Sequence, residues 1–179
     1  MKKISALVLA ALLAAGGYLY YTPYGAVKNL AEAVKAKDLD TVAQYIDTAA
    51  LRNNLAEQMK AVVGKKMLGE MSDNPFSALA MSLAAPMVEA LSLGVGTPTG
   101  VTKILNGQNP LDILSDKAVE AVNAQTGGLN WENAETEYLD MNTFQVKWQN
   151  EQNQALRVVF ERNGLTAWKM TKLMLPLAE

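Results

Sequence analysis

The sequence contains no cysteine and no histidine. Without cysteine the chain can form no disulfide, no thiol nucleophile and no iron–sulfur cluster. Without histidine it lacks the commonest general base and the commonest transition-metal ligand. These two absences exclude zinc chemistry and Ser–His catalysis together, and we expect no cofactor and no metal. A lipoprotein linkage is excluded as well, because no cysteine lies near the N-terminus.

Positive charge is also scarce. The 16 lysines and arginines are outnumbered by 18 aspartates and glutamates, which gives a net charge of −2. Beyond the N-terminus the only basic run is Lys65-Lys66. Binding to nucleic acid requires clustered positive charge to neutralise phosphates. We therefore expect no nucleic acid among the partners.

The longest apolar run extends from Ile4 to Tyr21 and carries no charge. Its length is close to the ~20 apolar residues that a membrane-crossing helix requires. Lys2 and Lys3 precede it, and four tyrosines follow near its end (Tyr18, Tyr20, Tyr21 and Tyr24). Lysines favour the cytoplasmic side and tyrosines gather at membrane interfaces. The pattern predicts a single-pass anchor in contact with the lipid bilayer, with the N-terminus in the cytoplasm and the body on the other side of the membrane.

Two other interpretations of this run stay open. It can be a secretory signal that is cleaved after Ala14-Ala15-Gly16, because signals end in a small-x-small site. It can also be an ordinary buried helix, since a core helix is apolar all round. Against cleavage, the apolar character continues past Gly17 into the tyrosines. We therefore divide the chain into an anchor or signal sequence at 1–21 and one extracytoplasmic domain at 22–179.

Three helices are expected at the start of the body. Thr22-Pro23 is typical of a helix start, with threonine as N-cap and proline at the first helical position. That helix should bury Val27, Leu30, Ala31 and Val34 and end near Lys37. Asp38 can cap a second helix whose inner face is Leu39, Val42, Ala43 and Ile46. Asp47 or Thr48 can cap a third helix, which carries Leu51, Leu55, Met59 and Val62.

The residues from Thr22 to Leu55 (TPYGAVKNLAEAVKAKDLDTVAQYIDTAALRNNL) carry a resemblance to a known family. A Tyr-x-Pro-Tyr-type start after a membrane segment, a Lys-Asp break, a Tyr-Ile-Asp step and an Ala-Leu-Arg resemble the bacterial domain of unknown function 2939 family. Trp168-Lys169-Met170 and Leu175-Pro176 resemble its closing strand, whereas Thr48 and Ala49 stand where an aromatic residue is usual. The resemblance implies an envelope protein of undetermined activity and implies no catalytic residues. With the predicted anchor, it implies a single pass through a bacterial inner membrane and a body in the periplasm.

The middle of the chain is unusually apolar. Asn74-Pro75 starts a helix whose residues 76–88 carry no charge, and Pro86 should kink it. Thr97 should cap a short helix that buries Val101, Ile104 and Leu105, and a further helix is expected over 112–124. An uncharged segment of this kind either fills the core, lines a pocket for an apolar ligand or contacts the bilayer.

From Trp131 onward apolar and polar residues alternate, so that every second residue is apolar. This pattern is typical of half-buried antiparallel strands. Asp140 to Thr143 and Asn163-Gly164 are expected turns, and Asn150 to Gln154 is a looser one. In a regular strand Trp168 and Met170 would lie on one face, and Leu173 and Leu175 on the other. We therefore predict a bulge near Thr171 or Lys172, which would bring all four to the same face. The fold class is therefore α+β: an N-terminal transmembrane helix, then a helical layer packed on a C-terminal four-stranded antiparallel meander.

Such a fold can enclose an apolar pocket between the sheet and the middle helices. The candidate lining residues are Phe76, Leu79, Leu83, Met87, Leu91, Phe144, Val146, Trp148, Leu156, Val158, Phe160 and Trp168.

Catalysis has only weak candidates. Glu135 and Glu137 lie two apart on a strand, so they share a face and can form a carboxylate pair, but a solvated outer face of the strand is the favoured interpretation. Glu89 is the only acid in apolar surroundings. Gly94-x-Gly96 lacks the pattern of a phosphate loop. The remaining candidate acids and hydroxyl donors are Asp47, Asp140, Tyr18, Tyr45 and Tyr138.

Two functions follow from these patterns. The first, which we favour, is a non-enzymatic envelope module that binds a partner protein or supports the envelope. The second is a tethered binder of a lipid or another apolar molecule in the helix–sheet pocket. A pocket of ~300 Å³ or more distinguishes the second from the first, which should be close-packed.

Overall fold

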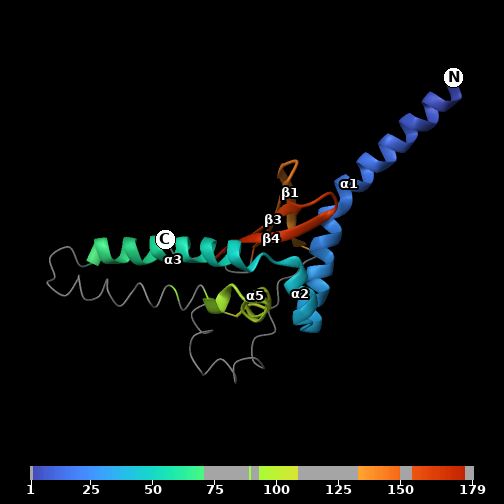
Figure 1. Ribbon diagram of the computed structural model, residues 1–179. Helices are drawn as coiled ribbons and strands as arrows, with labels where there is room; N and C mark the ends of the chain where they lie inside the picture. Colours follow the sequence, from blue (N-terminus) through green and yellow to red (C-terminus); the bar gives the residue numbers. More distant parts are fainter. Residues whose placement is uncertain (1, 71–88, 90–92, 109–132, 150–154, 176–179) are drawn as a thin grey trace.

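The computed structural model describes residues 2–70, 89, 93–108, 133–149 and 155–175. In these ranges the helices precede four strands, which form one antiparallel sheet in the order β1-β2-β3-β4. This arrangement confirms the predicted α+β class (Figure 1). The elements are α1 (Lys2–Ala36), α2 (Leu39–Tyr45), α3 (Thr48–Glu70), α5 (Pro98–Leu105), β1 (Glu135–Asp140), β2 (Thr143–Gln149), β3 (Ala155–Asn163) and β4 (Ala167–Met174).

The predicted helix start at Thr22-Pro23 is wrong, because α1 runs without a break from Lys2 to Ala36 and contains Pro23 in its interior. A proline inside a helix removes the hydrogen bond to the carbonyl four residues earlier, here Leu19. The hydroxyl of Thr22 replaces that bond and donates to the Leu19 carbonyl at 2.7 Å. The threonine that was expected to cap a new helix therefore helps to continue the existing one.

The two halves of α1 have different surroundings. The N-terminal half projects away from the other elements, and the C-terminal half lies beside the sheet and α2 (Figure 1). Leu7, Leu12 and Leu13 are 65–72% exposed, whereas Leu30 and Val34 are fully buried. The apolar run is thus no core helix. By length and composition α1 is able to cross a membrane.

Local capping places α2 and α3. Lys37 has a positive φ of 57° and ends α1 in a Schellman motif, in which Asp38 N–H donates to the Ala33 carbonyl and Lys37 N–H to that of Val34. Asp38 then caps α2, as predicted. Asp47 caps α3 through Ala50 N–H at 3.0 Å.

The predicted inner face of α2 is only half right. Val42 and Ile46 are buried, but Leu39 is 40% exposed and Ala43 is exposed too. A helix of seven residues has about two turns, and only the side that carries Val42 faces its neighbours.

The sheet has the predicted bulge. Val159 pairs with Lys172 and Phe160 with Met170, so Thr171 is the extra residue. The bulge restores the parity of the inner face, because Trp168, Met170 and Leu173 are all buried. The turns at Asp140–Thr143 and Asn163-Gly164 also form, the latter with a φ of 89° at Gly164. The expected turn at 150–154 and the expected helices at 74–88 and 112–124 lie outside the described residues.

One buried cluster joins the inner face of the sheet to the helices. α1 contributes Leu30 and Val34, α2 contributes Val42, and α3 contributes Leu51 and Leu55. The short helix α5 begins after the predicted cap Thr97 and buries Val101, Ile104 and Leu105 in the same cluster. The core therefore lies between one face of the sheet and the C-terminal half of α1.

Candidate functional site: a cleft beside the N-terminal helix

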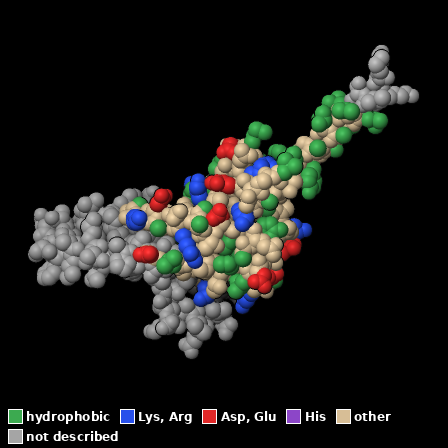
Figure 2. Space-filling view, viewed as in Figure 1, with side chains coloured by type: hydrophobic (Ala, Val, Ile, Leu, Met, Phe, Trp, Pro, Cys, Tyr) green, Lys and Arg blue, Asp and Glu red, His purple; other side chains and the backbone are tan. Residues whose placement is uncertain are grey.

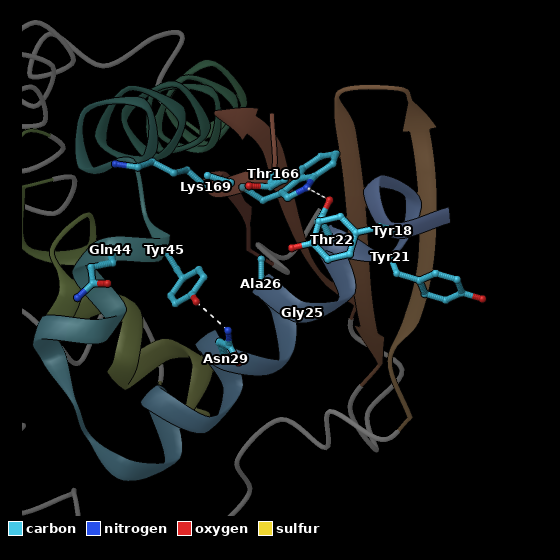
Figure 3. Close-up of a pocket in the computed structure, with 12 residues that line it drawn as sticks. Tyr18, Tyr21, Thr22, Gly25, Ala26, Asn29, Gln44, Tyr45, Thr166 and Lys169 are labelled. Carbon is cyan, nitrogen blue, oxygen red and sulfur yellow. Dashed lines mark hydrogen bonds between the residues drawn. The ribbon is translucent and has the colours of Figure 1, made fainter. Parts of the chain in front are cut away.

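A cleft of about 480 Å³ lies where α1 leaves the body, between α1, the end of α2 and the turn that leads into β4 (Figure 3). Its volume is in the range of small-molecule sites. Aromatic and uncharged polar side chains predominate in its walls, and Lys169 is its one charged lining residue. The cleft is lined by Tyr18, Tyr21, Thr22, Gly25, Ala26, Asn29, Gln44, Tyr45, Thr166, Ala167, Trp168 and Lys169.

One face of α1 forms the floor. Thr22, Gly25, Ala26 and Asn29 follow one another at i, i+3, i+4 and i+7, so they lie on the same side of the helix. Small residues at the centre of this row leave the space open. Apart from its chain neighbours and the backbone of its own helix turn, a Cβ atom at Gly25 would meet no atom within 4 Å.

The wall next to β4 is held by a hydrogen-bonded chain through Thr22. The Trp168 indole N–H donates to the Thr22 hydroxyl at 2.8 Å, and that hydroxyl donates in turn to the Leu19 carbonyl (Figure 3). Trp168 is 2% exposed, so its N–H has its partner in a nearly dry environment. The chain couples the sheet to α1 at the position where Pro23 leaves a carbonyl without a backbone donor.

The opposite wall comes from α2. The Asn29 side-chain amide donates to the Tyr45 hydroxyl at 2.8 Å, with Gln44 beside them (Figure 3). Across the cleft Lys169 is half-buried, and within the described ranges no carboxylate lies at ion-pair distance from it. The walls thus offer hydroxyls, amides and one ammonium group to a ligand.

A cluster of aromatic rings supports the cleft from the sheet side. Tyr24 of α1 contacts Phe144 at 4.9 Å between ring centroids, and Phe144 contacts Tyr138 at 5.0 Å and Trp168 at 6.4 Å. Tyr138 also donates its hydroxyl to the Tyr20 carbonyl at 2.6 Å. Burial raises the pKa of Tyr138, which keeps this hydroxyl protonated and able to donate.

The predicted helix–sheet pocket is only partly visible. Its sheet residues lie in the core, with exposed fractions of 0–8%, and only Trp168 also lines the cleft (Phe144, Val146, Trp148, Leu156, Val158, Phe160 and Trp168). Its helix residues lie outside the described residues (Phe76, Leu79, Leu83, Met87 and Leu91). The pocket therefore stays a prediction.

The candidate carboxylates are dispersed. Glu137 accepts a hydrogen bond from Gln145 at 2.7 Å and Glu135 pairs with Lys147 at 3.5 Å, both on an exposed part of the sheet. Asp47 caps α3, and Glu89 is exposed. Asp140 accepts from Asn142 N–H, and this bond, with one from Thr143, lowers its pKa. No group of three acidic side chains able to hold a metal occurs in the described part of the chain.

Sequence reasoning found Tyr18, Tyr45 and Trp168 but did not bring them together. It missed Thr22, Gly25, Asn29, Gln44, Thr166 and Lys169. A signal was present in the row Thr22, Gly25, Ala26 and Asn29, which puts small and polar residues on one side of an otherwise amphipathic helix.

These features define an α+β protein with an N-terminal helix long and apolar enough to cross a membrane. The model of the family described as "Protein of unknown function (DUF2939)" matches residues 12–104, and the chain belongs to this family. The match covers α1 from Leu12, α2, α3 and most of α5, whereas the C-terminal resemblance lies beyond it. Neither the comparison with curated proteins nor the comparison with solved structures found a match.

Proposed function

We propose that this protein is a non-enzymatic binding module, held by α1 in a bacterial inner membrane with its body in the periplasm, and that the cleft beside α1 is its binding site. The observation that carries the proposal is the continuity of α1. One helix provides both the exposed apolar segment and the floor of the cleft. The binding site is then held next to the bilayer surface.

The direction of insertion is supported by the flanks of the apolar segment. Lys2 and Lys3 precede the apolar segment, and the tyrosines follow it. Lysines favour the cytoplasmic side of a membrane and tyrosines favour its interface, so the N-terminus is expected in the cytoplasm. Tyr18 and Tyr21 belong both to this aromatic group and to the cleft wall. A ligand in the cleft would therefore lie at the level of the lipid head groups.

The lining favours an amphiphilic ligand with a small polar or anionic group. Aromatic faces contribute apolar contact, and hydroxyls, amides and Lys169 contribute directed polar contacts. A non-enzymatic role agrees with the scattered carboxylates, each of which has a structural partner or an exposed position.

The topology can be tested with single cysteines, because the natural chain has none. Lys35 is exposed at the end of α1 that is far from the apolar segment. We expect Lys35→Cys in the full chain to react with a membrane-impermeant maleimide in spheroplasts. Labelling only after the inner membrane is permeabilised would contradict a periplasmic body, and recovery of the chain in the soluble periplasm would contradict a retained anchor.

The binding site can be tested by filling the cleft at Gly25. Mass spectrometry of organic extracts from the purified chain should detect a co-purifying amphiphile, and Gly25→Phe should deplete it. The matched control is Gly17→Phe, since Gly17 is equally free of neighbours but does not line the cleft. Equal recovery of the amphiphile from both variants, or no amphiphile from the natural chain, would argue against the cleft.

A further inference from the structure

The two hairpin turns of the sheet carry exposed apolar side chains. Met141 at the β1–β2 turn is 84% exposed, and Leu139 beside it is 52% exposed. Leu165 at the β3–β4 turn is 73% exposed. In a meander of four strands these two turns lie at the same end of the sheet. Leu139, Met141 and Leu165 therefore form one apolar edge at this end of the sheet.

Arg162 joins the two turns. Its guanidinium donates to the Leu165 carbonyl at 2.7 Å and to the Met141 carbonyl at 3.1 Å, and it lies 4.4 Å from the centroid of the Trp168 ring. Arg162 N–H also donates to the Asn142 carbonyl. Turn carbonyls that are already bonded lose less when they leave water. The apolar side chains are thus presented on a connected support.

This edge lies on the membrane side of the body. Near the turns, Tyr138 bonds to the Tyr20 carbonyl and Trp168 bonds to Thr22, which places this end of the sheet level with the tyrosine group on α1, at the end of the apolar segment. In Figure 1 the β1–β2 turn points to the same side as the N-terminal half of α1. Met141 follows Tyr138 by three residues, so it reaches up to about 10 Å beyond that level. Hydrophobic side chains stand out at this end and along α1 in Figure 2.

We propose that Leu139, Met141 and Leu165 insert into the boundary between head groups and acyl chains of the membrane that α1 crosses. The inference rests on the proposed anchor and adds a second contact, which fixes the tilt of the body on the bilayer. Apolar side chains of interfacial segments enter this boundary by about 5–10 Å. The bilayer is the occupant indicated by position, because the edge continues the exposed apolar surface of α1 and the interfacial tyrosines.

The test uses four single-cysteine variants of the full chain, each labelled with an environment-sensitive fluorophore and reconstituted into phosphatidylcholine–phosphatidylglycerol vesicles. Met141→Cys and Leu165→Cys report on the turns, and Leu12→Cys reports on the anchor. Lys35→Cys is the control, because Lys35 is exposed at the far end of α1. Lipids that carry a nitroxide near the head group serve as quenchers for the turns and for position 35, and lipids that carry the nitroxide deep in the acyl chain serve as quenchers for position 12.

We expect loss of fluorescence at 12, 141 and 165, with a blue-shifted emission at both turns, and no loss at 35. Quenching at 12 without quenching at both turns would overturn this inference and leave the anchor intact. Absence of quenching at 12 would refute the anchor and the inference together. Quenching at 35 as strong as at the turns would also overturn the inference, because the body would then lie flat on the membrane.

Discussion

Asp47 shows how a residue with catalytic potential can have a structural role. Its carboxylate accepts from Ala50 N–H at the start of α3, and its backbone N–H donates to the Met170 carbonyl of β4. The side chain therefore satisfies one of the free amides of the helix N-terminus. The backbone bond does not depend on the side chain.

We expect Asp47→Ala to lower the free energy of unfolding by about 1 kcal/mol, or the melting temperature by about 2–4 °C. Asp47→Asn keeps a capping oxygen and should lose much less. Thermal unfolding followed by circular dichroism in detergent measures both. If the two variants lost the same stability, the carboxylate would have a role other than capping.

Asp38 makes the stability of α2 depend on pH. Hydrogen bonds from the side chain and the backbone N–H of Thr41 lower its pKa below the ordinary 3.8. A lowered pKa in the folded state contributes stability above the unfolded pKa, and this contribution is lost as the pH falls through the folded pKa. We expect the stability difference between the natural chain and Asp38→Asn to shrink as the pH falls below 3.8. Unfolding over a pH series measures it, and a difference independent of pH would contradict the prediction.

At the scale of the elements, α1 is joined to the sheet next to Pro23. Thr22 is linked to Trp168, which is 146 positions away in the sequence. Thr22→Val removes both hydrogen bonds of the hydroxyl and leaves the buried indole N–H without this partner. We expect it to lower the free energy of unfolding by about 1–3 kcal/mol, measured by chemical denaturation.

Thr22→Ser keeps the hydroxyl and is the matched control, which should stay close to the natural chain. A double-mutant cycle with Pro23→Ala separates the two bonds, because alanine restores a backbone N–H for the Leu19 carbonyl. In that background Thr22→Val should cost about 1 kcal/mol less. Additive effects of the two substitutions would show that the Leu19 bond contributes nothing.

The contact between α3 and β4 protects an edge of the sheet. Gln58 donates to the Leu173 carbonyl at 2.7 Å and accepts from Leu175 N–H at 3.1 Å, while Asn54 accepts from Leu173 N–H at 3.0 Å. Exposed strand edges pair with other chains. The two amides thus satisfy backbone groups that would otherwise invite aggregation.

We expect Gln58→Leu to lower the free energy of unfolding by about 1–3 kcal/mol and to increase aggregation of the purified chain. Glu57→Leu adds the same apolar side chain at an exposed neighbouring position and is the control. Denaturation and light scattering measure the two effects. If both variants aggregated equally, the aggregation would result from the added surface hydrophobicity and not from the loss of the Gln58 hydrogen bonds.

At the scale of the whole molecule, the exposed half of α1 should decide where the protein resides. Arginine near the centre of a membrane helix costs about 2.5–3.5 kcal/mol. We expect the double variant Leu9→Arg and Leu12→Arg to move the chain from the carbonate-resistant membrane pellet to the soluble fraction. The control exchanges two exposed body leucines, Leu39→Arg and Leu93→Arg, and should stay in the pellet. Retention of both variants would mean that the body itself holds the protein to the membrane.

The elements themselves could be predicted to a large extent. Asp38 and Thr97 as caps, the turn at Asn163-Gly164 and the bulge at Thr171 all follow from local rules of backbone geometry. The cleft could not be predicted in the same way. Its walls come from α1, α2 and β4, and the residues that meet there share no motif along the chain.

The sequence by itself determined the apolar segment, the caps, the strand periods and the absence of cysteine and histidine chemistry, because each depends on residues close together in the chain. Only the tertiary structure decided that α1 passes through Pro23, that a cleft opens beside it and that the end of the sheet with the two hairpin turns lies beside the tyrosines of α1. The physical reason is that these features depend on hydrogen bonds between distant segments, from Trp168 to Thr22 and from Tyr138 to Tyr20. Local preference at Thr22-Pro23 favoured a helix start, but in the folded chain the Thr22 hydroxyl donates to the Leu19 carbonyl and accepts from Trp168 of the sheet.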